Sequence, residues 1–126
     1  MTSIESGKRL SRTANKKGLL KMANAHIPSE IADEYYFLMG DFKAMMIDGT
    51  GKSPKAMNTY YNNYMKSHKD IKDIAAFAMA LNHTELLLDG EAQTLYANLC
   101  VNVTREVYYS DRFSDEEKAA FHQYLD

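Results

Sequence analysis

Apolar residues recur at helical spacing between Ile31 and Met46, and this stretch carries the broadest apolar face in the chain. Successive inward positions are separated by four, three, four and three residues: Ile31, Tyr35, Leu38, Phe42 and Met45. Because an α-helix turns once every 3.6 residues, these side chains share one face. Met39 and Met46 widen that face. We therefore expect this helix to lie deep in a core, with its neighbours packed on it.

Turn and cap signals mark where this helix and the next one begin and end. Pro28 disfavours helical geometry just before it, and Ser29 can cap the helix that follows. Gly49 can supply the left-handed residue at which that helix stops. Ser53 and Pro54 then form an N-cap followed by proline at the first helical position, which predicts the start of a third helix.

The next two predicted helices have apolar faces of different composition. The third is expected to turn these side chains inward: Met57, Tyr61, Tyr64 and His68. Asp70 and Asp73 suit the cap and first turn of a fourth helix. Its expected core positions are Ile71, Ile74, Ala75, Ala78 and Leu81. This helix either breaks at residues 82–84 or continues to about Gly90.

A fifth helix is predicted from about Glu91 to Tyr109. Its apolar positions recur every three or four residues over four turns: Ala92, Leu95, Leu99, Val103 and Val107. The valines also allow a β-strand, but the helical spacing outweighs that alternative. A capping box from Ser114 to Glu117 opens a short last helix, whose apolar positions are Phe121, Tyr124 and Leu125.

The start of the chain is polar and basic. Residues 1–9 are expected to form a flexible arm, and a helix is predicted from Leu10 to Ala25, with Gly18 weakening it. No hairpin, repeat or linker pattern occurs. The pattern as a whole predicts an all-α, single-domain bundle of five or six helices over residues 1–126.

Composition narrows the class of protein further. Hydrophobic residues make up 45% and charged residues 25%, which is ordinary for a globular domain. The single Cys100 excludes an intramolecular disulfide and a multi-cysteine zinc site. Eight Met and nine Tyr suit either a core of adaptable side chains or a contact surface, and their helical spacing favours the core. No signal-peptide or membrane-spanning pattern occurs, so we expect a cytoplasmic protein.

The net charge of −2 conceals a strong asymmetry. Residues 1–21 hold six basic residues and one acid, Glu5, so the remaining residues carry a net charge of −7. The last third of the chain is the most acidic. Such segregation suggests a polyanionic partner, or head-to-tail contacts between copies of the chain.

The motifs that could carry catalysis are incomplete. The run from Gly49 to Ser53 resembles part of a P-loop, but the glycine required before it is Met46, and a helix rather than a strand precedes it. His83 and Glu85 resemble part of a zinc-deaminase motif whose paired cysteines are absent. The four histidines are scattered, so no metal site or cofactor is expected. The acid pairs at 33–34 and 116–117 look like solvated or helix-terminal charges, and we expect a protein that is not an enzyme.

Basic residues carry the leading functional hypothesis. Lys8, Arg9, Arg12 and Lys16 would share one side of a helix, where a phosphate backbone could bind. The expected nucleic-acid-binding residues are Lys8, Arg9, Arg12, Lys16, Lys17, Lys52 and Lys55. Lys52 and Lys55 lie near a predicted helix N-terminus, which could also contact a phosphate. A second, weaker basic region that could extend the same surface contains Lys52, Lys55, Lys66, Lys69 and Lys72. A solvated terminal face is an equally open interpretation of the basic start.

Two hypotheses about function follow. The first is a non-catalytic helical subunit or accessory protein that contacts nucleic-acid backbone, DNA or RNA, independently of sequence and within a larger nucleoprotein complex. The second is a protein-binding adaptor or inhibitor, for example a phage-encoded anti-defence protein, that acts through an acidic or Tyr/Met-rich surface.

Overall fold

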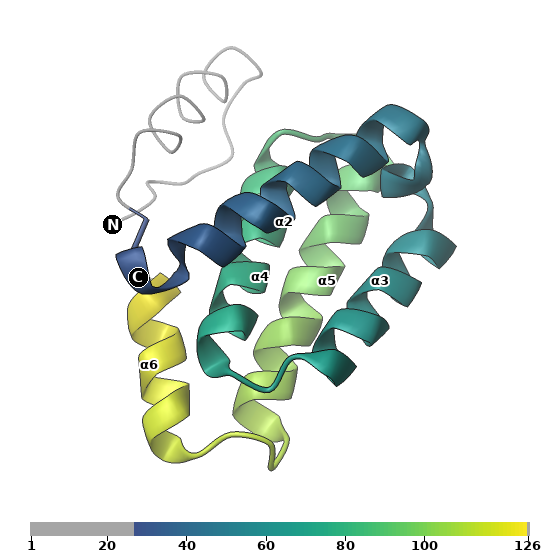
Figure 1. Ribbon diagram of the computed structural model, residues 1–126. Helices are drawn as coiled ribbons and strands as arrows, with labels where there is room; N and C mark the ends of the chain where they lie inside the picture. The colour runs from purple at the N-terminus through teal and green to yellow at the C-terminus, as the bar shows by residue number, and fades with distance from the viewer. Residues whose placement is uncertain (1–26, 126) are drawn as a thin grey trace.

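Five α-helices and one turn of 3-10 helix account for most of residues 27–125, which are the residues that the computed structural model describes. The helices are α2 (Ser29–Asp48), α3 (Pro54–Ser67), α4 (Ile71–Leu86), α5 (Gly90–Tyr109) and α6 (Asp115–Leu125), with the 3-10 turn η1 (Thr50–Lys52) between α2 and α3. This part of the chain contains no strand, so the all-α prediction is confirmed. Figure 1 shows α2 lying across α4, with α3 and α5 beside them and α6 at the far end. The predicted arm and the predicted helix at Leu10–Ala25 lie outside the described residues.

The central element is α4, not α2. It packs against α2, α5 and α6, and its residues from Ile74 to Phe77 are each 0% exposed. Alanine side chains let neighbouring helices approach α4 closely on several sides; the buried ones are Ala75, Ala76, Ala78 and Ala80. The prediction that neighbours pack on the 31–46 helix is confirmed for α4, but α4 is more deeply buried than α2. The sequence pattern gave alanine too little weight, because its small side chain adds little to a hydrophobic pattern even where it is buried.

The inner face of α2 was predicted correctly. Ile31, Tyr35, Leu38 and Phe42 are buried, while Met45 is only partly buried. The opposite side of the helix is unusually apolar for a surface, with Tyr36 and Phe37 each 60% exposed and Ile47 80% exposed. These three residues are called the α2 outer face below.

Aromatic rings fill the space between α2, α3 and α5. The Phe42 ring lies 6.0 Å from that of Tyr96 at 87°, and the Tyr64 ring lies 4.2 Å from that of Phe77. Edge-on and tilted contacts of this kind are the favourable geometries for aromatic pairs. Tyr96 is 0% exposed, although it is not among the predicted apolar positions of its helix.

Most of the predicted helix ends are confirmed. Ser53 Oγ accepts a hydrogen bond from Ala56 N at 3.2 Å, and Asp70 Oδ1 accepts one from Lys72 N at 2.9 Å. The capping box is complete, because Glu117 Oε1 accepts from Ser114 N and Ser114 Oγ accepts from Glu117 N. Gly49 ends α2 with φ at 90°, a left-handed conformation that suits glycine.

One helix boundary differs from the prediction, and another decides between two predicted alternatives. Ser29 does not cap α2: the helix already includes it, and Pro28 holds the N-cap position with its carbonyl accepting from Ile31 N at 3.0 Å. A proline cap explains this shift, because its fixed φ allows the helix to begin at the very next residue. The fourth helix is unbroken through residues 82–84 and ends at Leu86.

Among the helices of residues 27–125, none is long and apolar enough to cross a membrane.

Candidate nucleic-acid interface

The turn at residues 49–53 is a helix connection that uses its own polar groups. Asp48 Oδ1 accepts hydrogen bonds from Thr50 N and Thr50 Oγ1, and these bonds lower the pKa of the Asp48 carboxyl. Thr50 O accepts from Ser53 N, and Gly51 O accepts from the buried Tyr96 hydroxyl at 2.7 Å. A phosphate-binding loop aims backbone N–H groups at its ligand. Here Thr50 N and Ser53 N already have partners within the turn, which agrees with rejecting the P-loop interpretation.

The predicted binding residues fall into two groups. Lys52 and Lys55 are exposed at η1 and at the first turn of α3, where they can meet a ligand. The other predicted residues lie outside the described part of the chain: Lys8, Arg9, Arg12, Lys16 and Lys17. The structure therefore shows that Lys52 and Lys55 are exposed, and the basic start stays a prediction.

The exposed side of α3 is basic and polar throughout. Residues 50–69 contain four lysines and neither Asp nor Glu. Four exposed side chains on this helix, separated by four, three and four residues, form what we call the α3 stripe: Lys55, Thr59, Asn62 and Lys66. Residues at this spacing share one side of a helix. The stripe thus places two uncharged polar side chains between two cations on a helix that has no carboxylate.

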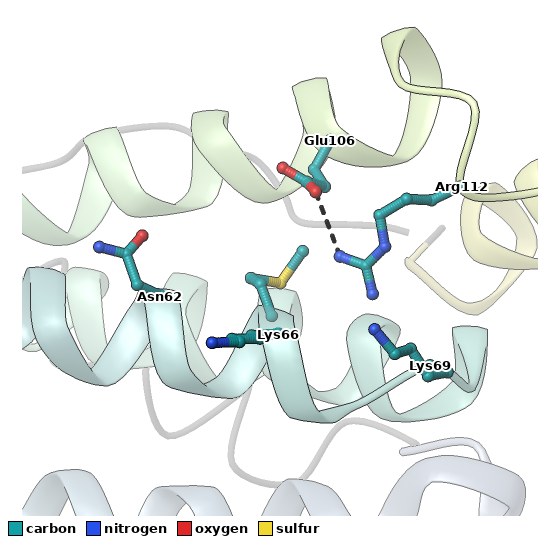
Figure 2. A pocket seen from close by; sticks show the side chains of 6 residues that line it. Asn62, Lys66, Lys69, Glu106 and Arg112 are labelled. Carbon is teal, nitrogen blue, oxygen red and sulfur yellow. Dashed lines mark hydrogen bonds and ion pairs between the residues drawn. The ribbon is translucent and has the colours of Figure 1, made fainter.

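A cleft of about 310 Å³ lies where the α3 stripe meets the end of α5 (Figure 2). It is lined by Asn62, Met65, Lys66, Lys69, Glu106 and Arg112. Lys66 belongs to α3, Lys69 to the following loop and Glu106 to α5, while Arg112 comes from the loop before α6. Three cations and one carboxylate therefore surround this cleft.

Arg112 is held in place by two hydrogen bonds and an aromatic ring. Its Nη1 donates to Glu106 Oε2 at 3.2 Å, and its Nη2 donates to the carbonyl of His68 at 2.8 Å. The guanidinium carbon lies 5.0 Å from the centre of the Phe113 ring. These contacts fix the cation at the edge of the cleft and join two loops that are far apart in the sequence.

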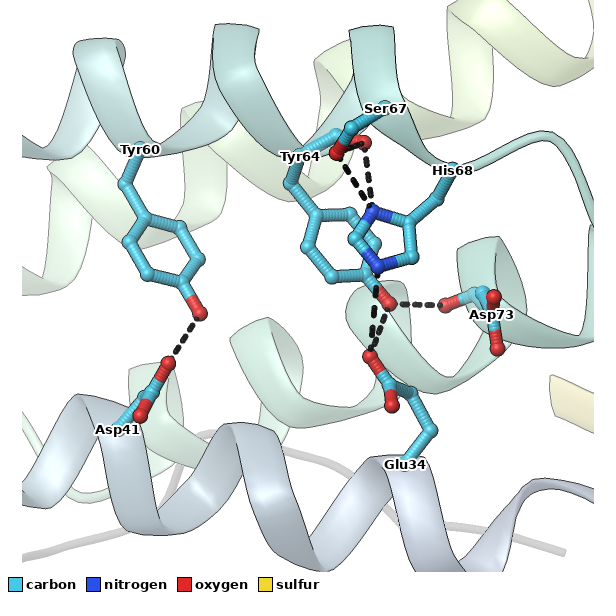
Figure 3. A network of polar contacts seen from close by, with 7 residues as sticks. All are labelled: Glu34, Asp41, Tyr60, Tyr64, Ser67, His68 and Asp73. Atoms are coloured by element: carbon cyan, nitrogen blue, oxygen red, sulfur yellow. Dashed lines mark hydrogen bonds and ion pairs between the residues drawn. The ribbon is translucent and has the colours of Figure 1, made fainter.

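A polar network joins α2, α3 and the start of α4 (Figure 3). The Tyr64 hydroxyl donates to Glu34 Oε2 at 2.7 Å and lies 3.1 Å from the Asp73 carbonyl, while the Tyr60 hydroxyl donates to Asp41 Oδ2 at 2.7 Å. Burial, then the bond to Glu34, raises the pKa of Tyr64 far above its usual value. Glu34 is only partly exposed, so the prediction of a solvated acid pair at 33–34 is wrong for it.

His68 completes this network at the end of α3. Its ring stacks on that of Tyr64 at a centroid distance of 3.7 Å, and its Nε2 lies 3.8 Å from Glu34 Oε2. Its Nδ1 lies 3.0 Å from the Tyr64 carbonyl. The backbone carbonyl of His68 accepts a hydrogen bond from Arg112, so His68 links this network to the cleft.

His83 has a structural partner of its own. The Tyr35 hydroxyl lies 2.6 Å from His83 Nδ1, between α2 and α4. Burial lowers the pKa of His83 to about 4 and raises the pKa of Tyr35 to about 12. At neutral pH the tyrosine therefore donates to a neutral imidazole, which gives this histidine a packing role.

The cysteine thiol and the possible metal-binding side chains of the described residues give no sign of a reactive site. Burial raises the pKa of the Cys100 thiol to about 12, which keeps it protonated and unreactive. Residues 27–125 contain no cluster of three or more His, Cys, Asp and Glu side chains that could hold a metal ion.

Sequence reasoning found the lysines of this surface but not its other residues. The absence of acids over residues 50–69 is visible in the sequence and could have placed Asn62 beside the predicted lysines. Glu106 and Arg112 could not be found in this way, because only the packing of α5 and the 110–114 loop against α3 brings them there.

Comparisons with protein-family models, with curated proteins and with solved structures found no match to this chain.

Proposed function

We propose that this chain is a small, non-catalytic helical subunit or accessory protein that contacts nucleic-acid backbone independently of sequence, within a larger nucleoprotein complex. The observation that carries the proposal is the α3 stripe, a helix side with lysines at both ends and no carboxylate. Phosphate backbones bind such surfaces by releasing condensed counterions.

The dimensions of the stripe suit this role. Lys55 and Lys66 are eleven residues apart on one helix, which corresponds to roughly 16 Å along its axis. That span covers several phosphates of one strand. Thr59 and Asn62, which lie between the lysines, are uncharged, so no side chain of the stripe repels the backbone between its two cations.

The test is a salt titration with a charge-matched control. Replacing Lys55 and Lys66 with Gln should weaken binding to unrelated oligonucleotides alike and flatten the slope of log affinity against log salt by about 1.4 to 1.8 units. The control replaces Lys43 of α2 and Lys118 of α6 with Gln, which removes the same charge from other helices. Equal effects of the two double variants, or no binding by the wild type at the lowest salt, would contradict the proposal.

The predicted basic start can be tested in the same assay. Replacing Arg9 and Arg12 with Gln should flatten the slope by roughly one to two units if these residues also meet phosphates.

A second candidate function rests on the α2 outer face. Exposed aromatic side chains are enriched at protein interfaces, and Tyr36 and Phe37 are each 60% exposed. This face would suit a protein-binding adaptor or inhibitor. Affinity isolation from the source cells would support that function if one partner bound the wild type and was lost on replacing Phe37 and Ile47 with Ser.

A further inference from the structure

The cleft beside the α3 stripe differs chemically from the stripe itself. It shares Asn62 and Lys66 with the stripe and adds a second lysine, an apolar side chain, a carboxylate and a held guanidinium. We propose that this cleft takes one unpaired base of a bound single strand, while neighbouring phosphates contact Lys66 and Lys69. This inference rests on the proposed function and specifies its ligand.

The size of the cleft limits what can enter. Its volume of about 310 Å³ is at the lower end of the range for small-molecule sites. One aromatic ring system fits this space, but a duplex does not. Met65, only 5% exposed, contributes a thioether to the lining, and thioethers pack favourably against aromatic rings.

The hydrogen-bonding groups match a base better than a phosphate. A phosphate oxygen only accepts hydrogen bonds, so it could use Lys66, Lys69 and Arg112 but would leave the Glu106 carboxylate and the Met65 thioether without a matching group. A base edge both donates and accepts, and it can pair with an amide and a carboxylate together. The cleft also lies near the carboxyl ends of α3 and α5, whose partial negative charges disfavour an anion inside it.

The guanidinium of Arg112 is arranged to donate without moving. A guanidinium has five N–H groups, and the contacts to Glu106 and to the His68 carbonyl engage Nη1 and Nη2 once each. Its position is set before any ligand arrives. A base would therefore meet a donor already in place at one end of the cleft, with the amide of Asn62 at the other end (Figure 2).

A nucleic acid that uses this cleft must be unpaired there. Base-specific contact to RNA and single-stranded DNA depends on bases that leave the stack, which a duplex does not offer. The chain should then bind a single strand more tightly than a duplex of equal length at the same salt concentration. A duplex that binds as tightly as the single strand would overturn the proposal.

The deciding experiment compares Asn62→Ala with Asn63→Ala on the full-length chain. Both side chains are exposed on α3, but only Asn62 lines the cleft. Binding is measured with a single strand that carries bases and with an abasic strand of the same length. We expect Asn62→Ala to weaken binding of the base-bearing strand about five- to tenfold, the effect of one lost hydrogen bond. The salt slope should not change, because no charge is removed.

The control and the abasic strand separate the possible results. Asn63→Ala should bind like the wild type, and the abasic strand should bind Asn62→Ala and wild type equally. If the two asparagine variants behave alike, or if abasic and base-bearing strands bind the wild type equally, the base site is refuted, while the lysine-dependent salt slope would leave the proposed function standing. Absence of binding at the lowest salt refutes both.

Discussion

Single polar side chains hold helices together in this protein. Tyr64 is the main example, because its hydroxyl on α3 contacts Glu34 on α2 and the Asp73 carbonyl on α4. Burial and the bond to Glu34 raise its pKa far above the usual value, so the hydroxyl stays protonated and remains a donor at neutral pH. A buried acceptor that loses such a donor costs free energy, since water does not fully replace it.

Tyr64→Phe should therefore lower the free energy of unfolding by about 1–3 kcal/mol. The ring stays, so its packing against Phe77 is kept and the loss reports the hydroxyl. Urea denaturation measures the change. Tyr109→Phe is the control, because that side chain is 85% exposed and its replacement should have no measurable effect.

His83 should make stability depend on pH. Its pKa is about 4 in the folded protein against 6.5 normally, so the unfolded chain binds a proton more readily between these values. The free energy of unfolding then falls as pH decreases from 6.5 to 4, by up to about 1.4 kcal/mol per pH unit. Because carboxylates also titrate near pH 4, the relevant quantity is the difference between wild type and His83→Gln.

Urea titrations at pH 7.0 and pH 5.0 test this expectation. The loss of stability between the two should be smaller in His83→Gln than in the wild type, whereas His122→Gln, at an exposed position on α6, should behave like the wild type. Equal losses in all three proteins would show that His83 is not buried in its neutral form.

At the scale of elements, the sequence pattern predicted where each helix lies in the chain better than it predicted which helices pack together. Caps and stops were readable because Ser53, Asp70 and Ser114 act on residues within three positions of themselves. The inner face of α2 was readable because large apolar side chains report burial directly. The central position of α4 was not, since alanine is common on buried and exposed helix faces alike.

In the candidate site too, local signals could be predicted and long-range packing could not. Lys52 and Lys55 were found from their local sequence, and the exposed lysines at 66 and 69 were noted as a weaker region. The cleft was not predicted, because Arg112 reaches it through a bond to His68 that spans 44 residues of sequence. The hydrogen bond between the buried Tyr64 and the half-buried Glu34, 30 residues apart, was missed for the same reason.

Two glycines should respond to alanine in opposite directions. Gly40 lies exposed within α2, and a Cβ there would meet nothing within 4 Å, so Gly40→Ala should stabilise the protein by about 0.5–1 kcal/mol. Gly49 has φ at 90°, which strains any residue with a Cβ, so Gly49→Ala should destabilise it. Thermal melting of the two variants measures both effects, and a lower melting temperature for Gly40→Ala would contradict the assignment of that side of α2 as open.

At the scale of the whole molecule, charge is sorted by helix. The carboxylates of α2 contrast with the acid-free stretch around α3: Glu30, Asp33, Glu34, Asp41 and Asp48. A polyanion would be repelled by α2 and attracted by α3. The two candidate functions therefore use different parts of the surface and can be separated by mutation.

Replacing Phe37 and Ile47 with Ser should leave oligonucleotide affinity and its salt slope unchanged, because neither change alters charge and both lie on α2. The Lys55 and Lys66 double variant should in turn keep any protein partner bound through α2. For oligonucleotide binding, the change in binding free energy of the variant with all four substitutions should equal the sum of the changes in the two double variants, as is usual for distant sites. A salt slope that changes with the α2 variant would show that the two surfaces are coupled.

The burial of residues 74–77 in α4 also determines how often their backbone amides contact solvent. Amide hydrogens exchange with deuterium only when their hydrogen bonds open, and the opening of a core helix requires the whole structure to unfold. The amides from Ile74 to Phe77 should therefore exchange at the rate of global unfolding, so their protection factors report the total stability of the protein. Amides of α6, which has one fully buried side chain, Phe121, should exchange sooner through local opening.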